Sequence, residues 1–184
     1  MKRKIERNYL EIKSIKDLND SKFFLNGYSV EFVKPTDFQL NKFFYKKIGK
    51  DHHWVDRLVW TDKQWIEYTS DKKVKTYIIK KKDDLAGYFE LIFHEDKKEV
   101  EIAYLGLLEE YQNQKLGSYL LSSAIKESFL KKTNRVWVHT CSLDHKNALN
   151  NYIARGMKIF KKEYISKLKY YILIVSNEKS KIKK

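Results

Sequence analysis

The sequence contains little of several residue types, and each scarcity excludes a class of protein. Cysteine occurs once, as Cys141, so neither an internal disulfide nor a cysteine-based zinc site can form, and a reducing compartment is expected. One proline and six glycines argue against a collagen-like, linker-rich or multidomain chain. No run approaches the roughly 18 apolar residues of a membrane span, and no apolar segment follows the charged start as in a signal peptide. The sequence therefore predicts one soluble, cytoplasmic domain over residues 1–184, with no membrane partner.

Positive charge, in contrast, is abundant. The chain has 38 Lys and Arg against 24 Asp and Glu, which gives a formal net charge of +14. Two basic tails, residues 1–7 and 178–184, each carry an excess of three positive charges. Only five basic residues are arginine, which disfavours base reading because arginine makes the bidentate contacts to bases. The net charge by itself has three possible explanations. They are lysine side chains that merely face solvent, attraction of a polyanionic ligand and, least favoured, non-specific nucleic-acid binding.

Hydrophobic periodicity predicts the order of the secondary-structure elements. Two helices are expected to begin after Asp37 and at Thr61 or Asp62, which are good N-cap residues. The other predicted helices cover 117–130 and 144–154, and the predicted strands are 28–33, 76–80, 86–93, 100–107, 136–140, 157–160 and 170–175. Short polar breaks make the three strands between residues 76 and 107 an antiparallel meander, and the last two strands are expected to form a closing hairpin. This order predicts an α+β fold, with a central mixed, mostly antiparallel sheet of about seven strands flanked by about four helices.

Residues 101–118 are the most informative segment. A strand leads through a short polar loop into a long amphipathic helix with Gly117 and Ser118 at its start. Free backbone N–H groups and the helix dipole at such a start favour phosphate, and glycine permits close approach. An ordinary strand-to-helix turn fits the same residues. The glycine-rich loops typical of dinucleotide and ATP sites are absent from the sequence.

Two motifs extend this observation. Residues 112–117, Gln-Asn-Gln-Lys-Leu-Gly, follow the pattern (Arg/Gln)-x-x-Gly-x-(Gly/Ala), except that Lys115 replaces the first glycine. From Ala148 onward the chain follows Ala-x-x-x-Tyr and then Gly-Phe, with Tyr152 as the tyrosine and Met157 in place of phenylalanine. In these motifs, and in its element order over residues 74–175, the chain resembles the Gcn5-related N-acetyltransferase (GNAT) family. The resemblance implies a single GNAT-like domain that uses acetyl-CoA as the acetyl donor.

The same resemblance implies a set of cofactor-binding residues. These are Leu105, Gly106, Leu107, Gln112, Asn113, Gln114, Lys115, Leu116, Gly117, Ser118 and His145. Backbone N–H groups of 113–118 would hold the pyrophosphate, and strand residues 105–107 would pair with the pantetheine arm. Because Lys115 places a Cβ where the family has glycine, we expect cofactor binding to be weakened rather than abolished. Binding by the backbone can survive if φ is negative at Lys115, and its ammonium could itself meet a phosphate. His145 fits a surface histidine beside a helix cap equally well.

Acetyl transfer to an amine needs a proton acceptor and a proton donor. Glu101 lies eleven residues before Gln112, as the basic carboxylate does in the histone-acetyltransferase branch of the family, so the resemblance makes it the candidate base. Glu90 and Glu99 are its rivals, and a solvent-facing glutamate is the structural alternative. Tyr152 matches the family's general acid, with an ordinary core tyrosine as the alternative.

The acceptor side is expected in the segment between the first two helices. Trp54, Asp56 and Trp60 are the candidate substrate-binding residues, since aromatic rings and a carboxylate can bind a cationic amine. The tryptophans fit packing of the helices against the sheet as well. Residues 51–53, Asp-His-His, could suggest a metal site, but no third ligand is evident. No bound metal is therefore predicted.

Together these features predict an N-acetyltransferase that moves an acetyl group from acetyl-CoA to a primary amine of a small molecule or peptide. The amine would attack directly in a ternary complex. An inactive acyl-CoA-binding regulatory domain is the alternative, motivated by Lys115, and a basic nucleic-acid-binding module is a weaker one, motivated by charge alone. The chain would act as a monomer or homodimer.

Overall fold

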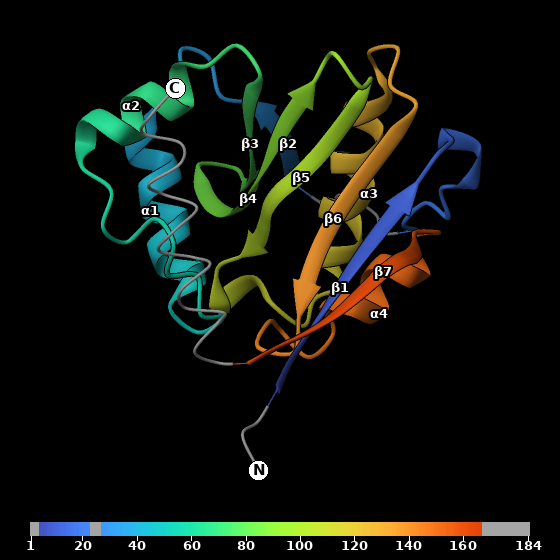
Figure 1. Ribbon diagram of the computed structural model, residues 1–184. Coiled ribbons are helices and arrows are strands. Elements are labelled where there is room, and N and C mark those ends of the chain that lie inside the picture. The colour runs from blue at the N-terminus through green and yellow to red at the C-terminus, as the bar shows by residue number, and fades with distance from the viewer. Residues whose placement is uncertain (1–3, 23–26, 167–184) are drawn as a thin grey trace.

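The computed structural model describes residues 4–22 and 27–166 as one mixed sheet with helices on both faces (Figure 1). The sheet has seven strands in the order β2-β3-β4-β5-β6-β1-β7. Its strands are β1 (Lys4–Ile12), β2 (Tyr28–Phe32), β3 (Val74–Lys81), β4 (Asp84–His94), β5 (Glu99–Leu107), β6 (Arg135–Cys141) and β7 (Lys158–Ser166). The helices are α1 (Phe38–Gly49), α2 (Asp62–Ser70), α3 (Leu116–Phe129) and α4 (Ala148–Ala154), with short 3-10 turns η1 (Ile15–Asp17) and η2 (Glu109–Tyr111). The predicted α+β class is thereby confirmed.

The pairing is antiparallel everywhere except between β5 and β6. The predicted meander is therefore present as β3-β4-β5. The last predicted strand, 170–175, and the basic tail 178–184 lie outside the described residues. None of the helices in the described part of the chain has the length and apolar character needed to cross a membrane.

The predicted helix caps are confirmed for the first two helices. Asp37 caps α1, because its Oδ1 accepts hydrogen bonds from the N–H groups of Gln39 and Leu40. Thr61 caps α2 in a reciprocal capping box with Gln64. At the start of α3, however, no side chain caps the helix. Its first backbone N–H groups are therefore available to hydrogen-bond to a ligand or to water.

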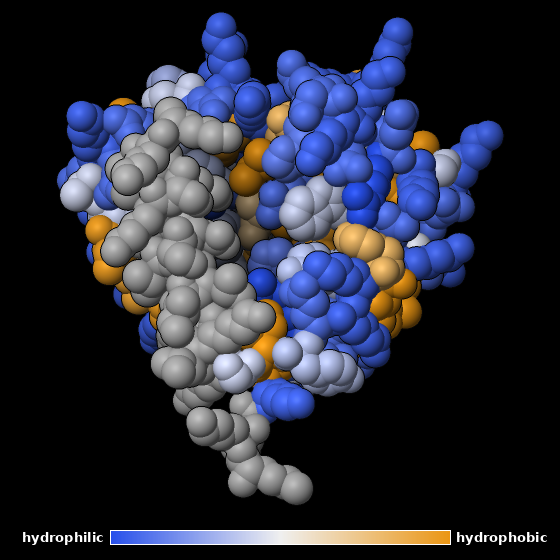
Figure 2. Space-filling model, viewed as in Figure 1, coloured by the Kyte–Doolittle hydropathy of each residue, from blue (hydrophilic) through white to orange (hydrophobic). Residues whose placement is uncertain are grey.

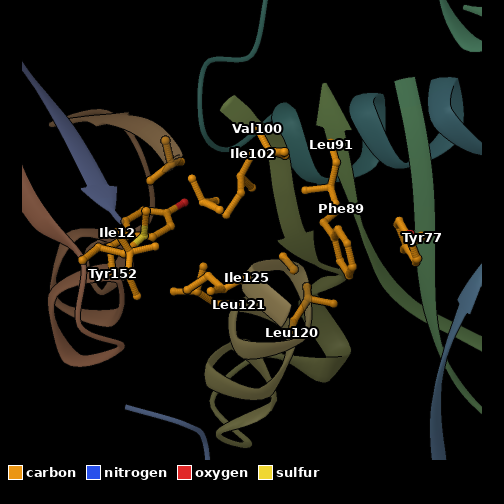
Figure 3. Packing of buried hydrophobic residues seen from close by; sticks show 14 of the residues in the cluster. Ile12, Tyr77, Phe89, Leu91, Val100, Ile102, Leu120, Leu121, Ile125 and Tyr152 are labelled. Atoms are coloured by element: carbon orange, nitrogen blue, oxygen red, sulfur yellow. The ribbon is translucent and has the colours of Figure 1, made fainter. Parts of the chain in front are cut away.

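Two apolar layers hold the helices to the sheet. The larger core lies between the sheet and α3 and includes Phe89, Ile102, Leu120 and Tyr152 (Figure 3). A smaller cluster joins α1 to the other face through Phe44, whose ring stacks on that of Tyr88 at 4.9 Å. Hydrophilic residues dominate the described part of the face shown in Figure 2. The helices thus leave the middle of one sheet face, over β5, open to ligands.

Strand β1 was not expected, since periodicity assigns only a polar start before residue 28. The structure places it inside the sheet, between β6 and β7, with Ile5, Leu10 and Ile12 buried. The register with β7 shifts between Tyr9 and Leu10, but the extra residue is Phe160 of β7. In β1 itself the buried position 8 carries the polar residue Asn8, which weakens the alternation that would reveal a strand. β7 pairs with β1 along its length, and the partner proposed for it in a closing hairpin lies outside the described residues.

Candidate active site

Strands β5 and β6 separate partway along their length. They pair in parallel only at Glu99, Val100 and Glu101, opposite Arg135, Val136 and Trp137. Beyond that point β5 continues to Leu107 paired with β4, while β6 continues to Cys141 paired with β1 (Figure 1). One backbone edge of residues 102–107 therefore has no strand partner among the described residues, and it can hydrogen-bond to an extended ligand.

A bulge in β5 re-aims its side chains at this opening. Tyr104 pairs with Glu90 and Ile102 with Leu91, so Ala103 is the extra residue. Because of this extra residue, Tyr104 lies on the α1 side of the sheet together with Glu101, whereas Ile102 and Leu105 face α3. Without the bulge, alternation would turn the Tyr104 side chain into the core beneath α3.

A cavity of about 1980 Å³ opens over this part of the sheet. It extends from the loop before α3, past β5, to the loop between α1 and α2. All of the predicted site residues line it except Gln114 and Leu116. The Gln114 side chain lies instead beside Tyr28 and the Glu110 carbonyl, and Leu116 is fully buried in the core.

The loop before α3 forms one end of the cavity. Gln112 Nε2 donates to the Leu107 carbonyl at 3.3 Å, which ties the loop to the end of β5. Asn113 and Lys115 both have positive φ, 59° and 61°, so the condition of a negative φ at Lys115 is not met. This conformation explains the family's glycine at position 115, because only glycine adopts it without strain. The turn directs the uncapped start of α3 at the cavity.

Helix α4 brings Tyr152 to the same cavity. Asn151 Nδ2 donates to the Gly117 carbonyl at 3.1 Å and so joins α4 to the first turn of α3. Tyr152 is 8 % exposed, and its hydroxyl has no hydrogen-bond partner within the described chain. Figure 3 shows this hydroxyl pointing toward β5. Burial, with a smaller effect of the Asp144 charge, raises the pKa of Tyr152 far above its usual value, so the hydroxyl stays protonated.

His145 precedes α4 and bridges two sides of the cavity. Its Nδ1 accepts a hydrogen bond from the Asn147 N–H at 3.2 Å. Its ring meets that of His52, from the α1–α2 loop, edge to face at 5.8 Å. Burial lowers the pKa of His52, which favours a neutral ring there.

Three glutamates were candidates for the base, and the structure separates them. Glu90 is fully buried and accepts from Arg57 Nη1 at 2.8 Å, while Glu99 accepts from Arg135 Nη1 at 3.0 Å. Only Glu101 of the three lines the cavity. Its Oε2 lies 3.4 Å from Nε2 of His94, whose side chain is 34 % exposed.

The α1–α2 loop supplies the opposite end of the cavity. Asp56 accepts hydrogen bonds from the hydroxyls of Tyr45 at 2.8 Å and Tyr104 at 2.7 Å. Trp54 and Trp60 are half-buried and line the cavity, whereas Trp65 is fully buried and packs the helices. Trp54 also packs on the rings of Tyr45, Tyr88 and Tyr104, and Trp60 on that of Trp65, so the packing role and a place in the cavity wall hold together for these two residues.

Sequence reasoning missed the buried polar network beneath this loop. Glu90 accepts from Arg57, from Tyr68 Oη at 2.7 Å and from Asn41 Nδ2 at 2.7 Å. The Arg57 guanidinium also lies 4.0 Å from the Tyr68 ring centre and 4.3 Å from that of Tyr104. The sequence did contain one sign of this network, because Glu90 is the only charged residue in the apolar strand of residues 86–93. A buried charge needs a partner, so a basic residue packed against this strand could have been expected.

The residues present fit a CoA thioester. The uncapped start of α3 suits a pyrophosphate, and the free edge of β5 suits the amides of a pantetheine arm. A Cβ added at Gly117 would meet only Leu107 Cδ1 at 3.8 Å and Asn151 Nδ2 at 4.0 Å, so the ligand side of this glycine is open. In the described ranges, no group of three His, Cys, Asp or Glu residues is arranged to hold a metal ion.

Comparison with known proteins gives a family match and a shared fold. A family model described as "Acetyltransferase (GNAT) family" matches residues 38–157. Among solved structures, a GCN5-related N-acetyltransferase from Kribbella flavida is 14 % identical, with a TM-score of 0.63, covering 86 % of this chain and 56 % of its own. One from Sphaerobacter thermophilus is 13 % identical, with a TM-score of 0.64 and coverages of 88 % and 50 %.

A third structure, an aminoglycoside acetyltransferase from a soil metagenome in complex with trehalose, is 12 % identical, with a TM-score of 0.59, and covers 71 % of this chain and 88 % of its own. At these identities the structural likeness concerns the fold alone. The chain spans about half the length of the first two structures. No curated protein matches by sequence.

Proposed function

The chain belongs to the GNAT family of acetyltransferases, and from this we propose that it transfers an acetyl group from acetyl-CoA to a primary amine by direct attack in a ternary complex. The observation that carries the proposal is the single cavity that joins the uncapped start of α3, Glu101 and Tyr152 to the α1–α2 loop. Acetyl-CoA supplies the activated acetyl thioester. Every other requirement falls on side chains and backbone groups of this chain.

The backbone would bind and orient the donor. The N–H groups at the start of α3 would hold its phosphates, with Lys115 and Ser118 at the same end of the cavity. The free edge of β5 at Leu105–Leu107 would hold the pantetheine arm in an extended conformation. Fixing the reacting groups in this way removes much of the entropic barrier.

Glu101 would remove the proton from the acceptor ammonium, because alkyl amines are protonated at neutral pH and only the neutral form attacks. The His94 ring at 3.4 Å is partly exposed and would pass this proton to solvent. Tyr152 would donate its proton to the departing sulfur, since its hydroxyl is protonated, lacks another partner in the described chain and lines the cavity.

One observation favours a second candidate, an inactive acyl-CoA-binding domain. Lys115 occupies a left-handed position that suits glycine, which is expected to weaken donor binding. Turnover distinguishes the two candidates, because an inactive domain binds acetyl-CoA and releases no thiol.

The test combines binding with turnover. Acetyl-CoA at about a hundred times its Kd should stabilise the protein by about 2.7 kcal/mol, which is a Tm increase of roughly 5–10 °C at this size. Release of free CoA should then be measured over a panel of primary amines. Glu101→Gln should lower kcat/KM about 100-fold, the scale of a lost general base, whereas Glu99→Gln, outside the cavity, should retain activity. Absence of a thermal shift at millimolar acetyl-CoA would overturn the assignment.

A further inference from the structure

The charges that line the cavity differ between its two ends. At the donor end Lys22, Lys115 and Arg155 line it and make no ion pair within the described ranges, and Asp20, which lines the same end, is paired with Lys126. Arg7 and Asp144 also line the cavity, close enough to His139 to influence its pKa. At the acceptor end the charged groups are Asp56, Arg57, Lys63, Glu67, Asp71 and Glu101. The first set suits the phosphates of the donor.

The acceptor end keeps an excess of negative charge after its ion pairs are counted. Arg57 is paired with Glu90, and Lys63 lies 3.9 Å from Glu67. Asp56, Asp71 and Glu101 then remain, and none of the three forms a direct ion pair with a lysine or arginine among the described residues, although the charge of Asp56 also acts on Arg57. A protein of net charge +14 thus has three such carboxylates lining this end of the cavity. Such a surface attracts cations and repels anions.

Of the three carboxylates, Asp56 is the one held in place by hydrogen bonds to both of its oxygens. Its Oδ1 and Oδ2 each accept from a tyrosine hydroxyl, at 2.8 and 2.7 Å. The Tyr45 oxygen in turn accepts from the Arg57 N–H at 2.9 Å, which orients its own proton toward Asp56. Burial raises the pKa of Tyr45 and of Tyr104, so both remain neutral donors. They hold the carboxylate in place without neutralising its charge.

The aromatic surroundings suit an ammonium ion at Asp56. The Trp54 ring packs against that of Tyr104 with a centroid distance of 4.8 Å and lines the cavity. Arg57 already lies over the rings of Trp60, at 4.7 Å, and Tyr68. No lysine or arginine of the described chain lies over Trp54, which leaves its ring available to a ligand cation.

The separation between Asp56 and Glu101 determines how far apart two amino groups of one ligand must lie to reach both carboxylates. The β5 bulge makes Glu101 and Tyr104 consecutive positions on one face, about 7 Å apart along the strand. Asp56 lies at the hydroxyl end of Tyr104. A cation at Asp56 is therefore separate from an amine that reacts beside Glu101, but within reach of the same small molecule.

We propose that the acceptor is a small molecule with at least two amino groups, one that reacts beside Glu101 and a second, charged one that binds Asp56. This rests on the proposed function for the reacting amine, but the Asp56 subsite itself is a binding property. Aliphatic diamines and amino sugars share the required chemistry.

The test measures binding first, so that it does not depend on turnover. The full chain, saturated with CoA, is titrated by calorimetry with cadaverine, with the amino sugar sisomicin, and with n-pentylamine as the matched monoamine. We expect cadaverine or sisomicin to bind about tenfold or more tightly than n-pentylamine. Asp56→Asn should reduce that preference to about threefold or less, whereas Asp51→Asn, in the same loop but outside the cavity, should retain it.

The outcomes separate the two proposals. An Asp56-dependent preference without thiol release from acetyl-CoA would support the subsite and overturn the transferase. Thiol release with equal binding of diamine and monoamine, or a preference that survives Asp56→Asn, would overturn the subsite and leave the transferase standing. The compound with the larger Asp56-dependent preference identifies which kind of amine the site fits.

Discussion

Replacing Lys115 by glycine should make the protein more stable. Lys115 has φ 61° and ψ 2°, a left-handed conformation that costs a residue with a Cβ roughly 1–2 kcal/mol. Glycine removes this cost but gains about 0.4–1 kcal/mol of conformational entropy in the unfolded state. The net gain is about 0.5–1 kcal/mol, which corresponds to a Tm increase of roughly 1–4 °C.

Two further variants separate strain from charge and from position. Lys115→Ala removes the ammonium but keeps the Cβ, so it should show little or none of the gain. Lys98→Gly, at φ 53° in the turn between β4 and β5, should give a similar gain far from the cavity. Acetyl-CoA should bind severalfold more tightly to Lys115→Gly and with unchanged affinity to Lys98→Gly, because only the former opens the donor end to a phosphate.

Thermal and urea denaturation measure the stabilities, and calorimetry measures the acetyl-CoA affinities. The reasoning is refuted if Lys115→Gly is no more stable than Lys115→Ala, since the two differ in the Cβ and not in charge. It is refuted as well if Lys115→Gly weakens acetyl-CoA binding, because the ammonium would then matter more than the close approach.

Three other outcomes are expected. Gly117→Val should raise the acetyl-CoA Kd about tenfold, or 1.4 kcal/mol, by calorimetry without unfolding the protein, because the added Cβ meets no protein atom closer than 3.8 Å. Tyr152→Phe should lower kcat about 10- to 100-fold in a thiol-release assay while acetyl-CoA affinity holds, and a normal rate would exclude it as the acid. Burial lowers the pKa of His52, so as the pH falls below about 6.5 the unfolded state binds more protons than the folded state does. The free energy of unfolding should therefore decrease as the pH falls through this range. His52→Gln should flatten this part of the profile in pH-dependent thermal melts, and an unchanged slope would assign it to other groups.

Features that depend on neighbouring residues were predictable from the sequence. The caps Asp37 and Thr61 act on N–H groups two or three residues away, so their local signal suffices. The meander, the loop at 112–117 and the strand-loop-helix order are local in the same sense. For this reason the positions expected to bind the donor were found together at one cavity, except for Gln114 and Leu116.

Features that depend on distant pairing were not predictable. Arg57 pairs with Glu90 across 33 residues, and nothing near either residue identifies the partner. The bulge at Ala103 is set by the register with β4, so alternation alone misplaces Tyr104 and hides its contact with Asp56. The left-handed conformation of Lys115 also escaped prediction, because lysine carries no preference for it.

The position of β1 has a consequence for how the chain folds during synthesis. Glu11 of β1 meets Arg135 of β6 across 124 residues, and β7 follows later still. The ribosome therefore releases β1 long before either neighbouring strand exists, while the β3-β4-β5 meander can pair as it emerges. Closing a loop of this length is slow and leaves an apolar strand exposed in the meantime. The second half of the sheet should thus form as a late, cooperative step, and β1 is a segment that a nascent-chain chaperone would bind until β6 and β7 have been synthesised.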